Sequence, residues 1–386
     1  MSITLHPYDA AAHGPGPHQN NHELAEPLAP LRLLRAKKAY TTRFLAERLS
    51  QSPKGFFLHR GMGVTPGSGD VVLARIVGVG QHPRLESPAS RRQVLFLGDE
   101  VLVAYGHRYA PDQFLAEVPA DLCQCHLIAA GGVAGLVTAR HAQMSQPTKL
   151  APVGLLADEH GVLNLSRLAP RRLGAVGAGA SPTGRPSVIA VLGTSMNSGK
   201  STAVSCLVKG LSDAGLAVSA GKATGTGSGN DPGMFVDAGA VRVLDFTDFG
   251  YPTTFQLDHR RVRGLFSDLL SALTDSSPDV IVVEIADGVY QGETRRLLAD
   301  PVFHTIVDRV IFAAADALGA IAGLQVLRDA NIHVAAVTGV LTSSPLAARE
   351  AAEVTDVPVL NTQSLCEPGV ALDLLPQSAK EPVAVS

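Results

Sequence analysis

Val188–Thr202, with the sequence VIAVLGTSMNSGKST, decides the fold of the C-terminal half of this chain. Its first residues are apolar and predict a buried strand that ends at Gly193. A polar loop follows, and Gly199-Lys200-Ser201 then leads into a run compatible with a helix. A strand, a glycine-bounded loop with Lys-Ser and a helix, in this order, predict a phosphate-binding loop. The glycines let backbone N–H groups point inward, and the start of the helix adds a positive dipole end.

The side chains of this loop have separate expected roles. Lys200 is expected to reach the β- and γ-phosphates of a nucleotide, and Ser201 to offer its hydroxyl to Mg²⁺. Five residues separate the two glycines, which makes the loop one residue longer than the common pattern. The predicted nucleotide-binding residues of the loop are Gly193, Thr194, Asn197, Ser198, Gly199, Lys200, Ser201 and Thr202.

Composition predicts a globular protein with more than one domain. The chain has 386 residues, of which 46% are hydrophobic and 17% charged. A net charge of −3 argues against a protein that coats nucleic acid. The four cysteines favour reduced thiols over a disulfide framework, and the N-terminus lacks the layout of a signal peptide. No apolar run reaches membrane-spanning length, so we expect a cytoplasmic protein without a nucleic-acid or membrane partner.

The pattern of the sequence divides the chain into four parts. Residues 1–30 are rich in His, Pro, Gly and Asn and are expected to be a mobile arm. Residues 31–169 predict a β-rich α+β domain, residues 170–186 a linker rich in Gly, Ala, Pro and Arg, and residues 187–386 a phosphate-loop domain.

Within the N-terminal domain, helical spacing of apolar residues predicts one helix over Leu31–Ser50. The runs Val71–Val79, Val94–Leu97 and Val101–Tyr105 predict strands, with Gly98-Asp99 as a hairpin turn between the last two. Short strands between Gly/Pro-rich turns favour a small barrel or sandwich.

Two other features of this domain suggest chemistry. The loop GHRYAPDQF, residues 106–114, gathers polar and aromatic side chains and is a candidate to contact a ligand or to serve only as a structural loop. Cys123, Cys125 and His126 lie too close together in sequence, without a second pair, to favour a metal site.

From Ser187 onward, apolar strands alternate with helices. This alternation predicts an α/β domain with a doubly wound, mostly parallel sheet that is covered on both faces. Ligands of such sheets bind beyond the carboxyl ends of the strands, so the loops that follow strands are the candidate site.

One such loop supplies a carboxylate. Glu284 ends the apolar strand Val280–Val283, at the position from which phosphate-loop enzymes hold Mg²⁺ directly or through water. Asp287 lies three residues further on and competes for this role. We favour Glu284 because of its place at the strand tip.

Another loop supplies a second lysine. Lys222 follows the strand Ala217–Ala220 and is expected to offset charge on a transferring phosphoryl group. Thr224 in the same loop is a candidate substrate contact, and Asp231 a candidate Mg²⁺ ligand. Lys200, Lys222 and Glu284 are therefore the predicted catalytic residues.

The C-terminal half resembles the dethiobiotin synthetase form of the phosphate loop, in the wider group with cobyrinic acid diamide synthases and MinD-like ATPases. The resemblance rests on the spacing G-x₅-G-K-[ST], on Lys222 after the second strand, on Glu284-Ile-Ala-Asp-Gly288 and on Leu318-Gly319-Ala320-Ile321. It covers about residues 187–360.

The resemblance implies roles for several residues. Lys200, Ser201 and Thr202 would hold the phosphates and Mg²⁺, Glu284 would assist the metal, and Thr194 would face the substrate. The family's Asp in the loop is replaced here by Ser195, which is expected beside the substrate and indicates a different metabolite.

Two further departures concern the base and the loop after Glu284. Asp287 interrupts the family's glycine pair, and Thr338-Gly339-Val340-Leu341 lacks its base-reading Asn, for which Asn361 is a possible substitute. GTP-specific phosphate-loop proteins usually carry an Asn/Thr-Lys-x-Asp motif, whose Asp reads the guanine. This sequence lacks the motif, so ATP is favoured over GTP.

The sequence thus predicts an ATP- and Mg²⁺-dependent enzyme that phosphorylates a small acceptor. We expect the acceptor to be a carboxylate that is activated for ligation or cyclisation, with Arg295 or Arg296 of the loop Tyr290–Arg296 pairing with an anionic substrate. Plain phosphorylation without a second step is a variant. The alternatives are a MinD-like switch or chaperone that acts through dimerisation, and a scaffold that only binds nucleotide. A homodimer is expected.

Overall fold

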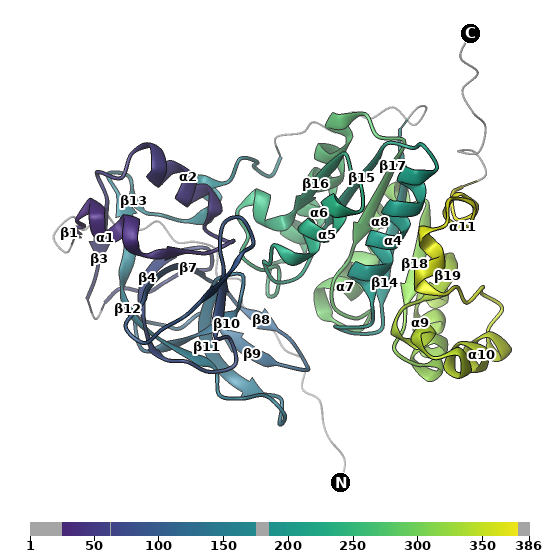
Figure 1. The fold of residues 1–386 in the computed structure, drawn as a ribbon, viewed down its shortest axis with the longest axis horizontal. Coiled ribbons are helices and arrows are strands. Elements are labelled where there is room, and N and C mark those ends of the chain that lie inside the picture. The colour runs from purple at the N-terminus through teal and green to yellow at the C-terminus, as the bar shows by residue number, and fades with distance from the viewer. Residues whose placement is uncertain (1–24, 62, 175–184, 377–386) are drawn as a thin grey trace.

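The computed structural model describes residues 25–61, 63–174 and 185–376. They form a β-rich N-terminal unit and an α/β C-terminal unit that lie side by side (Figure 1). This arrangement confirms the predicted fold class. Most of the predicted arm and linker lies outside the described residues. Residues 25–30 of that arm are described, and they hold a short strand and the first residue of a helix.

The N-terminal unit is built on one extended, mixed sheet. Strands β12, β4, β7, β11 and β10 pair in turn and close into a ring, because β10 pairs with both β11 and β12. Along β4, Val72 and Ile76 pack into one core, whereas Val71 and Leu73 pack against the helices on the other face. The strands are β1 (Ala25–Pro27), β2 (Lys37–Lys38), β3 (Phe57–His59), β4 (Val71–Gly78), β5 (Arg84–Glu86), β6 (Arg92–Val94), β7 (Glu100–Tyr105), β8 (Arg108–Tyr109), β9 (Phe114–Glu117), β10 (Cys125–Ala129), β11 (Val133–Arg140), β12 (Thr148–Asp158) and β13 (Gly161–Val162). The helices are α1 (Pro30–Arg35), α2 (Arg43–Gln51) and α3 (Leu165–Leu168).

The prediction of a single helix over Leu31–Ser50 is wrong. Helix α1 ends where Ala36 adopts an extended conformation, and β2 then pairs in parallel with β7. The Thr42 hydroxyl lies 3.0 Å from the amide N of Ala39 and 3.1 Å from the carbonyl O of Leu102. Such side-chain hydrogen bonds compete with helical ones, so the chain turns there before α2 begins.

The predicted hairpin around Gly98-Asp99 is also wrong. The chain does turn there, with Gly98 at a φ of 88° and its N–H donating to the Ile76 carbonyl. The strands on either side pair elsewhere, however, since β6 pairs with β5 and β7 with β4. The turn therefore joins two different sheets.

The C-terminal unit is a six-stranded sheet in the order β16-β15-β17-β14-β18-β19, and its pairings are parallel. Strand β14 lies centrally and is buried on both faces, because Ala190 and Leu192 pack into one core and Ile189 and Val191 into the other. The strands are β14 (Ser187–Gly193), β15 (Val218–Lys222), β16 (Arg242–Asp245), β17 (Val280–Glu284), β18 (Arg309–Ala313) and β19 (Val334–Thr338).

Helices cover both faces of this sheet, which makes it doubly wound as predicted (Figure 1). Helices α4, α5 and α11 contribute Leu207, Phe235 and Ala371 to one core, and α6, α8 and α9 contribute Phe266, Phe303 and Leu327 to the other. The helices are α4 (Lys200–Asp213), α5 (Asn230–Asp237), α6 (His259–Leu273), α7 (Gly292–Leu298), α8 (Pro301–Ile306), α9 (Ala317–Asp329), α10 (Pro345–Val354) and α11 (Pro368–Asp373), with 3₁₀ turns η2 (Phe246–Phe249), η3 (Thr274–Ser276), η4 (Val340–Ser343) and η5 (Thr362–Cys366).

Two expectations for this unit need correction. The run Val357–Leu360 forms only a single parallel bridge, Val337 to Val359, because Pro358 has no N–H to donate to a ladder. The segment Tyr290–Arg296 is largely not a loop. Helix α7 starts within it, where the Gln291 side chain accepts a hydrogen bond from the Thr294 N–H.

The two units pack closely against each other. The Tyr40 hydroxyl lies 3.0 Å from an Asp245 carboxylate oxygen, and an Arg43 guanidinium nitrogen lies 2.7 Å from Asp248. Gly131 approaches the C-terminal unit so closely that an added Cβ would lie 2.0 Å from the Gly227 carbonyl O. These contacts bring the N-terminal unit onto the loop that follows β15.

Candidate functional site

The stretch between β14 and α4 has the geometry of a phosphate loop. Gly199 adopts a left-handed conformation with a φ of 99° at the start of α4, and Asn197 has a φ of 61°. These positive φ angles curl the backbone over the helix N-terminus, where unpaired N–H groups favour an anion. The Lys200 ammonium donates to the Ser195 carbonyl at 2.7 Å and so lies over the loop. The C-terminal unit has a P-loop NTPase fold.

Glycines in the loops after β17 and β19 leave room for the backbone of the phosphate loop. Gly288, after β17, and Gly339, after β19, pass so close that an added Cβ would lie 2.2 Å from the Thr194 carbonyl O and 2.4 Å from the Ser198 carbonyl O. The Val340 N–H donates to Ser198 at 3.0 Å. The loops after β17 and β19 therefore clamp the phosphate loop from two sides.

The predicted catalytic side chains meet at the carboxyl edge of the sheet. Lys222 and Glu284 are register partners at the ends of β15 and β17, with Nζ to Oε1 at 3.0 Å. The Lys222 ammonium also pairs with Asp231 of α5. Although burial lowers the pKa of Lys222, the Glu284 and Asp231 carboxylates raise it well above its usual value. Lys222 is therefore a fixed positive charge.

Charges around Lys200 differ from those around Lys222. Burial lowers the pKa of Lys200, and the Lys222 charge adds to this, while Glu284 opposes it. Asp231 is also affected, since burial raises its pKa but the Lys222 ammonium and hydrogen bonds that include the Ser201 hydroxyl hold it below the usual value. Ser201, Lys222, Asp231 and Glu284 thus form one interacting cluster.

This cluster offers a place for a divalent cation. Glu284 is 2% exposed, and its Oε2 has no hydrogen-bond partner, which leaves one buried carboxylate oxygen free to accept from metal-bound water or to bind metal. Ser201, in the first turn of α4, interacts through its hydroxyl with Asp231 of the same cluster. No set of three His, Cys, Asp or Glu side chains within the described ranges is arranged as a metal site by itself. A cation here would need phosphate oxygens or water as further ligands.

Asp287 is a buried acid at the edge of this cluster. Its backbone lies in the left-handed region with a φ of 63°. Burial raises its pKa to about 6, although the charges of Lys200 and Lys222 work in the opposite direction. Besides competing with Glu284 for the metal, Asp287 therefore takes part in the electrostatics of the site.

The other predicted site residues lie at varied positions. Thr194 is partly buried with an unpartnered hydroxyl, Ser195 and Thr202 are exposed, and the Thr224 hydroxyl accepts from the Ala286 N–H at 2.9 Å. Asn361 caps η5, accepting from the Gln363 N–H and donating to the Thr342 carbonyl. Arg295 is exposed on α7. Their proposed roles stay predictions.

The N-terminal unit reaches the phosphate loop through the segment that the sequence singled out as GHRYAPDQF. This segment contains β8 and the turn into β9, and its Asp112 accepts a hydrogen bond from the Asn197 side chain. The Tyr109 ring lies 5.5 Å from that of Phe255 in the C-terminal unit. The phosphate loop is therefore contacted by the N-terminal unit.

Sequence reasoning missed two residues of the N-terminal unit near the loop after β15. Glu86 accepts from the Ser228 hydroxyl at 3.1 Å and from the Gly229 N–H at 2.8 Å. His82 lines the cavity between the units with Arg108. Neither position carries a local sequence signal, because the partners of both residues lie far away in the chain. Cys125 is buried in the core of the N-terminal unit and Cys123 is exposed.

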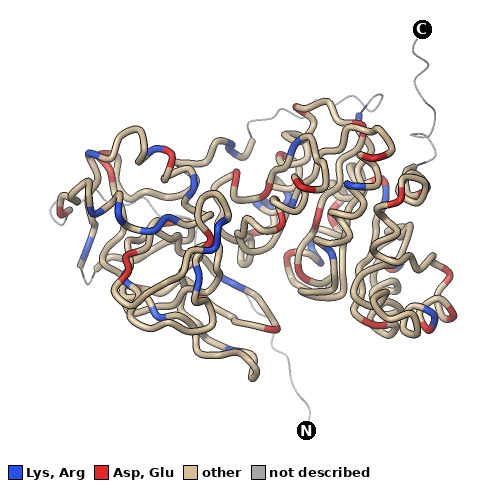
Figure 2. The backbone as a smooth tube through the Cα atoms, in the orientation of Figure 1, with Lys and Arg blue, Asp and Glu red and all other residues tan. Residues whose placement is uncertain are grey.

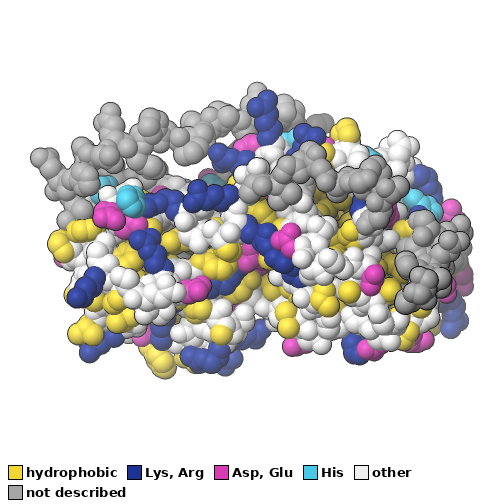
Figure 3. Space-filling view, turned by 90° about the horizontal axis from the view of Figure 1, so that it is seen from above, with side chains coloured by type: hydrophobic (Ala, Val, Ile, Leu, Met, Phe, Trp, Pro, Cys, Tyr) yellow, Lys and Arg dark blue, Asp and Glu magenta, His cyan; other side chains and the backbone are white. Residues whose placement is uncertain are grey.

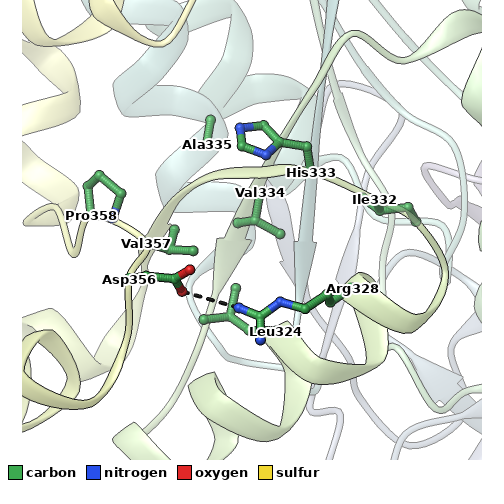
Figure 4. A pocket seen from close by; sticks show the side chains of 9 residues that line it. All are labelled: Leu324, Arg328, Ile332, His333, Val334, Ala335, Asp356, Val357 and Pro358. Carbon is green, nitrogen blue, oxygen red and sulfur yellow. Dashed lines mark hydrogen bonds and ion pairs between the residues drawn. The ribbon is translucent and has the colours of Figure 1, made fainter.

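One cavity of the described structure lies far from this chemistry. It measures about 260 Å³ and surrounds the start of β19, with Val334 and Ala335 on its wall (Figure 4). Arg328 and Asp356 face each other there at 3.2 Å, and both are exposed. Since β19 begins here, the cavity is at the amino end of the strands, opposite the phosphate loop.

Basic and acidic residues alternate along the backbone of both units (Figure 2), and side chains of both signs lie on the face in Figure 3. Within the described ranges, none of the helices combines the length and apolarity needed to cross a bilayer.

No family model and no curated protein matches the sequence. Similar solved structures include the signal recognition particle receptor FtsY from Elizabethkingia anophelis in complex with GDP, with 16% identity, a TM-score of 0.33 and coverage of 52% of this chain and 68% of that one. The signal recognition particle 54 kDa protein from Aeropyrum pernix in complex with GDP has 16% identity, a TM-score of 0.35 and coverage of 53% and 47%. The fold of the C-terminal unit is identified by its strand order and by the geometry of its phosphate loop.

Proposed function

We propose that this protein is an enzyme that transfers the γ-phosphoryl group of Mg²⁺-bound ATP to a small-molecule acceptor. The acceptor is a carboxylate, and the acyl phosphate that forms is attacked in a following ligation or cyclisation step. The observation that carries the proposal is the pair of lysines at the strand ends, with Lys222 held between two carboxylates beside the loop that Lys200 spans.

Each group of the cluster has a place in this chemistry. The loop N–H groups and Lys200 bind the β- and γ-phosphates. Lys222 stays charged and is fixed by Glu284 and Asp231, so it can stabilise the charge that spreads over the transferring group. Ser201 and Glu284 would hold Mg²⁺, which neutralises the phosphates when bound.

The contact of the N-terminal unit with the phosphate loop favours an enzyme with a small acceptor over a nucleotide-dependent switch. In a MinD-like switch or chaperone, a second copy is expected to cover the phosphate loop. Here Asp112 of the same chain contacts Asn197 of the loop, and Glu86 holds the loop after β15. Because the N-terminal unit of the same chain already contacts this surface, a small acceptor bound between the units is favoured over a second copy. The homodimer and the cytoplasmic location remain expectations.

The choice of ATP rests on the sequence, which lacks a guanine-reading motif. Asn361 is the proposed contact for the base. It lies after the bridge to β19, close to the clamp around Gly339, since Thr362 next to it donates to the Gly339 carbonyl at 3.3 Å.

ADP release by the purified full-length chain tests the proposal. We expect one short carboxylic acid from a panel to stimulate ADP release strongly, and Lys200→Ala to abolish it. GTP in place of ATP tests the nucleotide. If no acid stimulates turnover and ATP instead drives dimerisation, the switch replaces the enzyme.

A further inference from the structure

A second cavity lies between the two units and belongs to neither alone. It measures about 200 Å³. Its walls are His82, Arg108, Gln113 and residues 129–131 of the N-terminal unit, and Thr226–Ser228 of the loop after Lys222. It is smaller than the roughly 300–1,000 Å³ of pockets that take drug-sized ligands, so it suits a small metabolite rather than a nucleotide.

Arg108 brings a buried positive charge to the wall of this cavity. It is only 7% exposed, yet it forms no ion pair with any residue in the described part of the chain. One terminal nitrogen donates to Gln113 Oε1 at 2.9 Å, and its Nε has no hydrogen-bond partner. A buried guanidinium without a carboxylate is costly, because buried charges are normally paired.

The remaining contact of Arg108, with His82, does not give the guanidinium a negatively charged partner. Its other terminal nitrogen lies 3.3 Å from His82 Nε2, which is also 3.1 Å from the Ile128 carbonyl O. One ring nitrogen can donate to the carbonyl or accept from the guanidinium, but cannot do both. Burial, together with the Arg108 charge, lowers the pKa of His82 to about 4, so the ring is neutral and does not supply a countercharge. The guanidinium therefore has capacity for an anionic partner.

Two carboxylates that act on the Arg108 charge connect this cavity to the phosphate loop. Burial lowers the pKa of Arg108 to about 10, and the carboxylates of Asp112 and Asp287 oppose this effect from a distance. Asp112 contacts the phosphate loop through Asn197, and Asp287 follows β17 beside Lys200 and Lys222. Arg108 thus sits on the N-terminal side of the same site.

We propose that Arg108 binds a carboxylate of the acceptor in the cavity between the two units. The planar fork of a guanidinium matches a carboxylate and can bind it through two parallel hydrogen bonds. Gln113 and His82 orient the fork, and the loop Thr226–Ser228 closes the opposite wall. This inference rests on the proposed function, and it adds that the substrate is a small acid held by the N-terminal unit.

The experiment measures binding to the full-length chain by isothermal titration calorimetry. The probes are short straight-chain mono- and dicarboxylic acids, the primary amide of each, and inorganic phosphate. We expect at least one acid to bind and its amide to bind at least about 10-fold more weakly. In Arg108→Gln, affinity for that acid falls by about 10-fold or more, and Arg108→Lys recovers part of it. Arg92→Gln, at an exposed arginine of β6, is the matched control and leaves acid binding unchanged.

A second variant keeps the test decisive if Arg108→Gln does not fold. Ala130 lines the same cavity and carries no charge, so Ala130→Leu fills space and leaves the guanidinium in place. It should block the acid and preserve ATP binding. Acid binding that survives both variants, or phosphate binding without any acid binding, overturns the inference.

The two proposals fail in different ways. If an acid binds and stimulates ADP release equally in the wild-type chain and in Arg108→Gln, the acid site is wrong and the proposed function stands. If it binds an acid through Arg108 but never ATP, the proposed function is wrong and the acid site stands.

Discussion

The carboxyl group of Asp287 gives a sharp prediction about stability and pH. In the folded chain, burial raises its pKa from 3.8 to about 6. Below the lower value the group is protonated in both the folded and unfolded states. Between the two values the folded state holds more protons, so the free energy of unfolding falls as pH rises. Above a pH of about 6 the carboxylate is ionised in both states, and the folded state carries the full cost of burying its charge.

This cost can be worked out and removed by one substitution. At about 1.4 kcal/mol for each pH unit, a pKa of about 6 in place of 3.8 destabilises the ionised folded state by about 3 kcal/mol. The side chain keeps some exposure, and solvent screening reduces the figure to about 1–3 kcal/mol. Asn tolerates the left-handed backbone at this position, which has a φ of 63°. We therefore expect Asp287→Asn to raise stability by this amount at pH 8, and by about half as much at pH 5.

Urea denaturation of the nucleotide-free chain, monitored by circular dichroism from about pH 5 to pH 8, measures the free energies of unfolding of wild type and Asp287→Asn. Asp237→Asn, at an exposed acid of α5, is the control and should shift stability by the same small amount at every pH. A difference between wild type and Asp287→Asn that does not grow from pH 5 to pH 8 would refute the reasoning.

Three further predictions concern the loop and the domain interface. Lys200→Ala should weaken ATP binding by about 10–100-fold in a fluorescent-nucleotide titration, whereas Lys209→Ala, an exposed lysine on the same helix, should not. Gly131→Ala should cost about 2 kcal/mol or more, because its Cβ would overlap the backbone of the other unit. Gly233→Ala, which meets nothing within 4 Å on α5, should be neutral or stabilising, and equal melting temperatures for the two variants would count against the interface. Tyr40→Phe should cost about 1 kcal/mol through the lost hydrogen bond to a buried carboxylate, and an unchanged urea midpoint would contradict this.

The sequence was most informative where a signal is local. The strand, loop and helix around Gly193 and Lys200 follow from glycine positions and apolar runs, and the structure has them in that order. The meeting of Lys222 with Glu284 was also predictable, because both end parallel strands that share one edge of a sheet.

The remainder depends on contacts between distant parts of the chain. Apolar spacing alone could not reveal that β2 pairs with β7 and interrupts the expected helix. The segment with Arg108 stood out in the sequence, but its position depends on how the two units pack. His82 and Glu86 had no local signal, since their partners lie dozens of residues away.

Trapping of the product with hydroxylamine tests the central claim most directly. An acyl phosphate reacts with hydroxylamine to give a stable hydroxamate, so transfer to a carboxylate can be separated from ATP hydrolysis. With Mg²⁺, ATP and the acid that binds, we predict a hydroxamate that accumulates in step with ADP and is lost in Lys222→Met. ADP formation at the same rate with and without the acid, and no hydroxamate, would contradict the account.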